Sequence, residues 1–277
     1  MSATSMKQIK NRIKSIQGTR QITNAMQLVA ASRMKKMTKR IEAAKPYFTL
    51  LRDTLDEICR DNREFTSPYL REKEGRACHI VIAGDRGLAG GYNHNLFKSL
   101  SLNKDDLIVP IGKKAAEHLS SYEQYETGIE KAADAEFDDC KKLGKALTED
   151  FLKGKFTTLY ISYTSFKNML TQEPVTLKLL PLKRGEKKHD PKKGLTIYEP
   201  SSEGAFERIV PYYISGMIFG AVTESVTSET AARRTAMEAA TDNADTMLDR
   251  LKLEYNRARQ AAVTQELTEI VAGAENI

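Results

Sequence analysis

The chain has 277 residues, of which 40% are hydrophobic and 29% are charged, with three cysteines and no tryptophan. Its formal net charge of +6 is too modest to indicate a nucleic-acid binder by itself. The most apolar run, residues 209–222, is interrupted by Pro211 and Gly216 and is shorter than the roughly 20 residues of a membrane-spanning helix. We therefore expect no membrane span and no signal peptide. The odd cysteine set without CxxC spacing favours a reducing compartment.

Glycine and proline divide the chain into three parts. Residues 58–204 hold 12 of the 16 glycines and 6 of the 8 prolines, whereas residues 221–272 hold neither. Because these residue types mark turns and break helices, the middle is predicted to be rich in turns and the two ends to be long helices. The expected domains are an N-terminal coiled-coil helix over 1–57, a Rossmann-like α/β domain over 58–204 and a C-terminal coiled-coil helix over 205–277.

Apolar residues in both end segments recur at steps of three and four, which is typical of a coiled coil. The expected seam comprises Ile9, Ile13, Ile16, Met26, Ala30, Met37 and Ile41 at the N-terminus and Met237, Ala240, Ala244, Met247, Leu251 and Ala258 at the C-terminus, with a polar gap at Glu254. A 52-residue helix is roughly 78 Å long at 1.5 Å per residue, too long for a compact body. We therefore expect the two end helices to pair as a projecting antiparallel coiled coil.

The middle segment shows apolar runs that alternate with helical patterns. Strands are expected at 77–83, 107–111, 156–163 and 174–182, and helices from about 93, over 113–121 and over 138–152. This alternation predicts a mostly parallel sheet with helices packed on it.

The positive charge is concentrated at the N-terminal end. Residues 6–45 carry a net charge of +10, whereas residues 205–272 carry −3. A basic helix can follow nucleic-acid phosphates, dock on an acidic protein or simply be solvated, and net charge does not choose among the three. Aromatic residues for base stacking are missing from the basic segment.

The glycine-rich turn at 84–93 follows a predicted strand and precedes a predicted helix, where α/β folds bind phosphates. It lacks both the GxGxxG and the GxxxxGK[ST] spacing, so a structural turn is favoured over a nucleotide-binding enzyme site. The four histidines are scattered, and no nucleophile motif is complete. The sequence therefore offers no catalytic, metal-binding or cofactor-binding residues.

Several separated segments closely resemble the gamma subunits of bacterial F-type ATP synthases. They are QITNAMQLVAASRM at 21–34, GDRGLAGGYN at 84–93, AMEAATDNA at 236–244 and YNRARQAAVTQELTEIVAGA at 255–274. The resemblance runs from end to end. It implies a non-catalytic central-stalk rotor that couples proton flow through the membrane ring to ATP synthesis and hydrolysis at beta-subunit sites. The implied partners are the alpha and beta subunits of the catalytic hexamer, the epsilon subunit and the c-subunit ring, and the implied location is the cytoplasmic face of the inner membrane, as a peripheral protein.

The resemblance also implies a partner-binding role for ten residues. Those expected to engage the catch loops of alpha and beta subunits are Arg259, Gln260, Thr264 and Glu266. Those expected to face an acidic beta-subunit loop are Met26, Arg33, Lys35 and Lys36. Tyr198 and Glu199 fall in the segment that resembles the foot facing the c-ring. The alternatives from the residues themselves remain a coiled-coil nucleic-acid-binding protein and a small nucleotide-binding enzyme.

Overall fold

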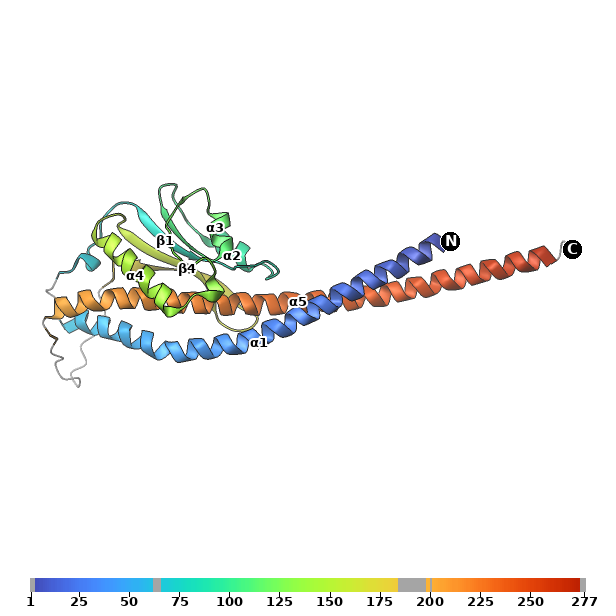
Figure 1. Cartoon of the computed structure of the whole chain (residues 1–277), viewed down its shortest axis with the longest axis horizontal. Coiled ribbons are helices and arrows are strands. Elements are labelled where there is room, and N and C mark those ends of the chain that lie inside the picture. Colours follow the sequence, from blue (N-terminus) through green and yellow to red (C-terminus); the bar gives the residue numbers. More distant parts are fainter. Residues whose placement is uncertain (1–2, 62–65, 184–197, 200, 275–277) are drawn as a thin grey trace. The chain divides into compact units, whose positions relative to one another are not determined.

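The computed structural model describes residues 3–61, 66–183, 198–199 and 201–274, and it divides into two compact units (Figure 1). The coiled-coil unit comprises Met1–Ala31 and Arg233–Ile277, and the α/β unit comprises Ser32–Ala232. The two longest helices, α1 (Ala3–Asp61) and α5 (Ser202–Ala274), each contribute to both units. The domain bounds expected from the sequence, 1–57, 58–204 and 205–277, remain a prediction.

The α/β unit contains the strands and short helices that the alternating pattern predicted. The strands are β1 (Ala77–Ile82), β2 (Leu107–Ile111), β3 (Glu123–Gln124), β4 (Thr158–Phe166) and β5 (Gln172–Leu180), and the helices are α2 (Tyr92–Ser99), α3 (Lys113–His118) and α4 (Phe137–Leu152), with 3-10 turns at Pro68–Leu70 and Ala132–Asp134. All four expected strands are present. The two-residue β3 was not predicted, because a pair of exposed polar residues has no hydrophobic period to recognise.

The sheet has the strand order β3-β2-β1-β4-β5. β1 lies parallel between β2 and β4, and β3 is parallel to β2, whereas β5 pairs antiparallel with β4. The expectation of a mostly parallel sheet is therefore confirmed. This order is the one found in doubly wound, Rossmann-like folds, here closed by an antiparallel edge strand.

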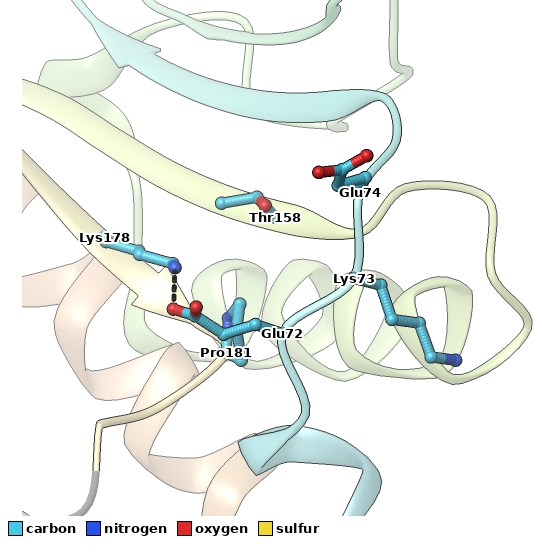
Figure 2. Close-up of a pocket in the computed structure, with 6 residues that line it drawn as sticks. All are labelled: Glu72, Lys73, Glu74, Thr158, Lys178 and Pro181. Carbon is cyan, nitrogen blue, oxygen red and sulfur yellow. Dashed lines mark hydrogen bonds and ion pairs between the residues drawn. The ribbon is translucent and has the colours of Figure 1, made fainter.

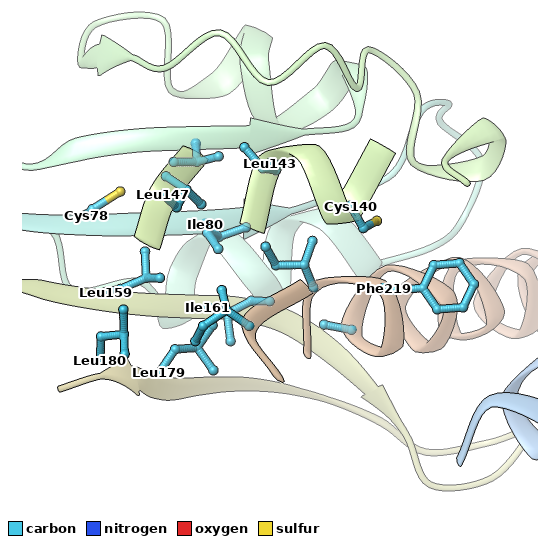
Figure 3. Close-up of a cluster of buried hydrophobic side chains, with 14 of the residues drawn as sticks. Cys78, Ile80, Cys140, Leu143, Leu147, Leu159, Ile161, Leu179, Leu180 and Phe219 are labelled. Atoms are coloured by element: carbon cyan, nitrogen blue, oxygen red, sulfur yellow. The ribbon is translucent and has the colours of Figure 1, made fainter. Parts of the chain in front are cut away.

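Alternate side chains of the strands enter two apolar layers, as the two-residue period of a strand requires. Ile80 and Ile82 belong to the larger cluster with helices α4 and α5, where Leu147 of α4 is fully buried (Figure 3). Val81 points to the other layer, with Leu96 of α2. The sheet is thus covered on both faces, which explains why its central strands are continuous apolar runs.

The first part of α5 is a core helix of the α/β unit. The helix is continuous through Pro211, because one proline removes a single intrahelical donor while burial of Phe206, Val210 and Ile214 holds the helix on the sheet. Among the described residues, one 18-residue window of α5 is apolar enough to cross a membrane by composition. Since 61% of that window is buried within the fold, core packing accounts for its composition.

In the coiled-coil unit, the C-terminal end of α5 shows the expected 3.5-residue period, and four of the six expected seam residues are buried, namely Met237, Ala244, Leu251 and Ala258. Figure 1 shows the two helix ends of this unit side by side, and the buried α5 residues are Met237, Thr241, Ala244, Leu248, Leu251 and Ala258. Only Met247 was wrongly placed in the seam: it is 44% exposed, whereas Ala240 is half-buried. The period alone does not decide between Ala240 and Thr241 or between Met247 and Leu248, because steps of three and of four both fit it. The residues that are buried at these two places are Thr241 and Leu248.

The N-terminal seam agrees better with expectation. Ile9, Ile13 and Ile16 are half-buried and Ala30 is buried. Between them the steps of three and four continue through three polar side chains, Arg20, Thr23 and Gln27. The seam of this unit is therefore apolar at both ends and polar at one place between them.

Candidate functional site

The glycine-rich turn at 84–93 is held by hydrogen bonds within the α/β unit. The Gly84 N–H donates to Asn93 Oδ1 at 2.9 Å. The carboxylate of Asp85 accepts hydrogen bonds from the backbone N–H groups of Ala132 and Ala133, both at 3.0 Å. Gly112, where β2 ends, has φ 92° and brings its backbone against Ala83. These hydrogen bonds hold the turn to the start of α2 and to the 3-10 turn at Ala132–Asp134.

A buried polar stretch of α5 covers the same end of β1. The Tyr92 hydroxyl lies 2.6 Å from Ser225 Oγ and donates to the Ser225 carbonyl at 3.0 Å. A Cβ added to Gly84 would meet Glu229 Oε1 at 2.9 Å, and Glu229 is only 5% exposed. Burial raises the pKa of Tyr92, which keeps the phenol neutral and able to donate. The place where Rossmann-like folds receive a phosphate is therefore packed by the chain's own helix, as a structural role for the turn requires.

The buried histidine and cysteines show no sign of reactive chemistry. His79 Nε2 lies 3.3 Å from Asp106 Oδ2 and its ring stacks on Tyr160, while burial lowers its pKa against the opposing effect of Asp106. Burial raises the pKa of Cys140 to about 12, and the pKa of Cys78 is raised for the same reason. Since the thiolate is the reactive form, these thiols are inert at neutral pH.

One open cleft of about 300 Å³ lies in the α/β unit, between β4, β5 and the segment that precedes β1 (Figure 2). It is lined by Glu72, Lys73, Glu74, Thr158, Lys178 and Pro181. Lys178 Nζ donates to Glu72 Oε1 at 2.9 Å, which lowers the pKa of the Glu72 carboxyl group. Lys73 extends away from this pair in Figure 2. The cleft brings together a neutralised ion pair rather than a nucleophile and a base.

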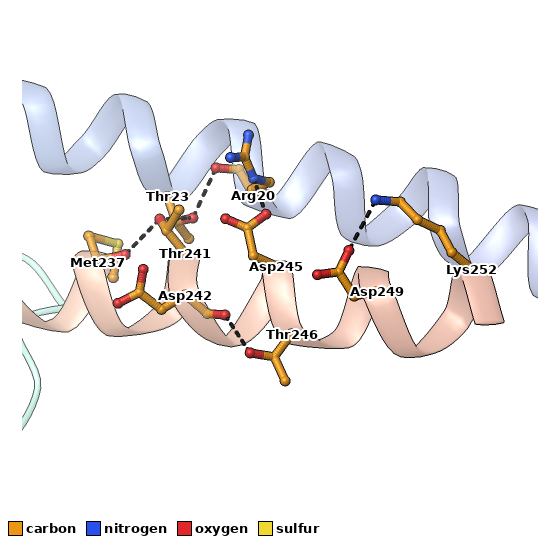
Figure 4. A network of polar contacts seen from close by, with 9 residues as sticks. All are labelled: Arg20, Thr23, Met237, Thr241, Asp242, Asp245, Thr246, Asp249 and Lys252. Carbon is orange, nitrogen blue, oxygen red and sulfur yellow. Dashed lines mark hydrogen bonds and ion pairs between the residues drawn. The ribbon is translucent and has the colours of Figure 1, made fainter. Parts of the chain in front are cut away.

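The coiled-coil unit contains a group of polar contacts between its two helices (Figure 4). Thr23 Oγ1 of α1 lies 2.8 Å from Thr241 Oγ1 of α5, and both side chains are buried. One step along the seam, the Arg20 guanidinium donates to the Asp245 carboxylate, and this hydrogen bond raises the pKa of Arg20. The sequence analysis missed all four residues. The only available signal was the phase of the period, which puts Thr23 and Thr241 in the seam.

The structure places the residues of the expected partner surfaces mostly in the open. Arg259, Gln260, Thr264 and Glu266 are exposed on α5 in the coiled-coil unit, and Met26 is half-buried on α1 of that unit. In the α/β unit, Arg33, Lys35 and Lys36 are exposed on α1. Tyr198 is half-buried and Glu199 exposed, just before α5.

Apolar residues beside the expected catch residues are exposed as well. Val263, Leu267 and Ile270 are 50%, 58% and 68% exposed, at steps of four and three along the last turns of α5. This spacing puts them on one face of the helix. An exposed apolar stripe on a long helix is typical of a surface that binds another chain. We call this apolar stripe and the four expected catch residues together the candidate partner-binding surface.

Comparisons with known proteins agree on one family. A family model described as ATP synthase matches residues 5–277. The chain is 43% identical to the ATP synthase gamma chain of Ruminococcus albus, with 98% of each chain covered, and 42% identical to that of Lachnoclostridium phytofermentans, with 99% of each covered. It is also 35% identical to a gamma chain named sodium ion specific, from Acetobacterium woodii, with 99% of each covered.

The fold is similar to chains of solved mitochondrial ATP synthase structures. A chain of the Euglena gracilis mitochondrial ATP synthase rotor matches with a TM-score of 0.66 and 17% identity, covering 95% of this chain and 100% of that one. A chain of the OSCP/F1/c-ring structure from the same organism matches with a TM-score of 0.69 and 18% identity, covering 98% and 94%. At these identities the likeness establishes the fold, a mixed α/β sheet with long terminal helices.

Proposed function

Because the chain belongs to the ATP synthase gamma chain family, we propose that it is the central-stalk rotor of an F-type ATP synthase. The observation that carries the proposal is the 43% identity that extends over 98% of both chains. A match of that extent covers the coiled-coil unit and the α/β unit together, so the whole gamma chain is represented. The antiparallel pairing of the two helix ends around Thr23 and Thr241 supplies the form that a shaft needs.

In this proposal the coiled-coil unit turns inside a hexamer of alternating alpha and beta subunits. The exposed Arg259, Gln260, Thr264 and Glu266 hydrogen-bond the catch loops of those subunits, and Met26 faces an acidic beta-subunit loop. Rotation requires that no single contact be strong. Exposed ion pairs and hydrogen bonds, each worth about 0–1 kcal/mol, meet that requirement, because they can be broken and remade at successive positions.

The α/β unit is proposed to bind the epsilon subunit and the ring of c subunits, with Tyr198 and Glu199 in the part that faces the ring. Its positively charged Arg33, Lys35 and Lys36 on α1 add attraction to an acidic beta-subunit loop. Such a subunit belongs to the membrane-associated complex as a peripheral protein, on the cytoplasmic side of the inner membrane. It moves without a membrane span of its own, because the ring supplies the membrane part.

The subunit is proposed to have no catalytic role of its own. The pKa shifts of its buried cysteines and the packed glycine-rich turn support this, since neither offers a nucleophile or a phosphate cradle. ATP would be made and hydrolysed at the beta-subunit sites, whose states the rotor sets. Nucleic-acid binding by the basic helix gains no support from the relatives reported above.

Reconstitution tests the proposal. The chain is purified, combined with alpha, beta and epsilon subunits of its source, and labelled for single-molecule observation through Leu152→Cys, which lies half-exposed on α4. We expect no ATP hydrolysis by the chain alone and ATP-driven, unidirectional stepwise rotation of the label in the complex. Rotation should fail with the chain truncated after Leu253, whose folding is largely kept because most of the removed end is exposed, Ala258 being buried.

The contradicting results are equally concrete. ATP turnover by the purified chain, or a label that stays fixed while the complex hydrolyses ATP, would remove the rotor assignment. Because one relative is named sodium ion specific, synthesis is measured in membranes energised by a proton gradient and by a sodium gradient. The ion that drives synthesis is then read directly.

A further inference from the structure

The polar contacts between the two helices of the coiled-coil unit occupy one short stretch of the seam. Thr23 and Thr241, each 8% exposed, meet hydroxyl to hydroxyl, and Arg20 pairs with Asp245 beside them (Figure 4). We call these four residues the polar layer. From the first pair to the second, the position moves back by three on α1 and forward by four on α5, so the two helices run antiparallel.

The apolar residues of this seam do not define their own alignment. The register set by Thr23 and Thr241 puts Ile13 opposite Leu251 and Ile16 opposite Leu248, since paired positions in an antiparallel pair have a constant sum. A shift of one helix by seven residues would again put apolar residues opposite apolar residues, with Ile13 opposite Ala258 or Ala244. Coiled coils with repetitive apolar seams are therefore prone to alternative registers, and single polar positions select among them.

We propose that the polar layer fixes the register of the coiled-coil unit, so that Arg20, Thr23, Thr241 and Asp245 are positioning residues of the rotor. The proposal rests on the proposed function for its consequence, because a shaft whose helices slip cannot deliver a defined angle to its partners. The register itself is a property of this chain alone.

The seven-residue shift that puts Ile13 opposite Ala258 separates every pair of the polar layer. It would put Thr23 opposite Leu248 and Arg20 beside Lys252. Each threonine would lose the hydroxyl opposite, and the arginine would face a like charge in place of Asp245. Repulsion between like charges and the loss of a hydrogen bond both disfavour that register.

The opposite shift, which puts Ile13 opposite Ala244, also breaks the threonine pair. It would put Thr241 opposite Ile16 and Thr23 opposite Arg234, while Arg20 would find Glu238. The charge pair is thus partly replaced, and the threonine pair carries the discrimination in this direction. The Met237 carbonyl oxygen lies 2.9 Å from Thr241 Oγ1 and the Arg20 carbonyl oxygen lies 3.1 Å from Thr23 Oγ1. Because each hydroxyl carries one hydrogen, one of the two donates across the seam in the observed register, whereas in the shifted register both can donate to their own helices. The layer therefore selects a register without leaving an orphaned hydroxyl in the others.

Disulfide trapping in the full-length chain tests the register directly. Ile13→Cys is combined with Leu251→Cys, which reports the observed register, or with Ala258→Cys or Ala244→Cys, which report the two shifted registers. The native cysteines stay in place, because the side chains of all three are buried. Mild oxidation followed by mass spectrometry of the linked peptides gives the share of each register.

The polar layer is then changed without changing its volume much. In the variant Thr23→Val, Thr241→Val and Asp245→Asn, we expect the linked fraction of the shifted pairs to rise by about tenfold, the change that the loss of a hydrogen bond and a charge pair produces between competing registers. Two matched controls should leave the fraction at the wild-type level. Thr23→Ser with Thr241→Ser keeps both hydroxyls, and Thr246→Val removes an exposed threonine that bonds only its own helix.

The outcomes separate cleanly. The proposal would be overturned if the shifted cysteine pairs were linked to the same extent in the variant and in the wild-type polar layer. It would also be overturned if, with the wild-type polar layer, the shifted pairs were already linked as often as the pair that reports the observed register. Loss of folding in the variant, measured by circular dichroism, would also overturn the proposal, because valines in a buried seam should keep the helices paired. None of these results depends on alpha or beta subunits, so a failure of the rotor assignment would appear only in the reconstitution.

Discussion

The α/β unit and the coiled-coil unit bury very different side chains. Among the described residues, all of the largest fully buried side chains lie in the α/β unit, including Phe156, Phe206 and Ile80. Within the described part of the chain, the coiled-coil unit buries three alanines, two threonines, two leucines and one methionine. Because stabilisation follows the apolar area buried, the first unit can hold itself together, whereas the second gains much less from its own seam. The difference indicates that the coiled-coil unit is built to be completed by other chains.

Matched leucine truncations should show this difference most strongly. Leu147→Ala removes a fully buried side chain between α4 and the sheet and is expected to lower the free energy of unfolding of the α/β unit by about 3–5 kcal/mol. Leu248→Ala, in the seam, should cost about 1–2 kcal/mol, because the two helices can close the space. Urea unfolding followed by tyrosine fluorescence and hydrogen exchange measures each unit. Equal losses for both variants would break the comparison, and Leu152→Ala on the surface of α4 is the control.

A backbone substitution should have the next largest effect. Gly112 has φ 92°, and a Cβ there would lie 2.2 Å from the Ala83 carbonyl oxygen. Gly112→Ala is expected to destabilise the α/β unit by at least about 1–3 kcal/mol, the cost of a strained backbone, with the clash added to it. Gly128→Ala shares the positive φ but has open space around it, so it isolates the clash. If the two variants melt alike, the close approach of β1 and β2 does not constrain this position.

A smaller effect is expected from the buried histidine of β1. Burial lowers the pKa of His79 in the folded state, so below pH about 6.5 the unfolded chain binds a proton that the folded chain resists. Stability of the α/β unit should therefore fall as the pH drops below that value, by at most about 1.4 kcal/mol per pH unit. His79→Gln should flatten this dependence, measured by urea unfolding from pH 7.5 to 5.5. His94→Gln, which changes an exposed histidine, should not, and an unchanged slope in the His79 variant would contradict the prediction.

The smallest effect on stability is expected at the candidate partner surface, where the effect on coupling is largest. Gln260→Ala with Thr264→Ala changes two exposed side chains and should shift the free energy of unfolding by less than about 0.5 kcal/mol. In energised membranes that carry the complete enzyme we expect ATP synthesis to drop several-fold, because the proposed hydrogen bonds to the catch loops are lost. Gln265→Ala on the same turns serves as a control. Undiminished synthesis would show that these two residues are not the contact.

Much of the fold could be predicted from the sequence because its signals are local. Glycine and proline marked the turn-rich middle, and each apolar run of the sheet was located within a few residues. The period of the seam was also right, but Met247 was chosen where Leu248 is buried, since the two are equally apolar neighbours. Which of them is buried depends on the helix opposite. The polar layer was missed for the same reason: Thr23 and Thr241 are 218 residues apart, and nothing local pairs them. The candidate partner residues came from resemblance, and no pattern in the chain itself indicates them.

The packed glycine-rich turn has a consequence for how folds change their use. In the α/β unit, the crevice that related architectures leave open for a cofactor is filled by the Ser- and Thr-rich stretch of α5 around Ser225 and Glu229. A peptide segment lies where such architectures bind a diffusible ligand, so the contacts of that place hold a helix to a sheet. The same strand order can thus serve the mechanical attachment of a helix.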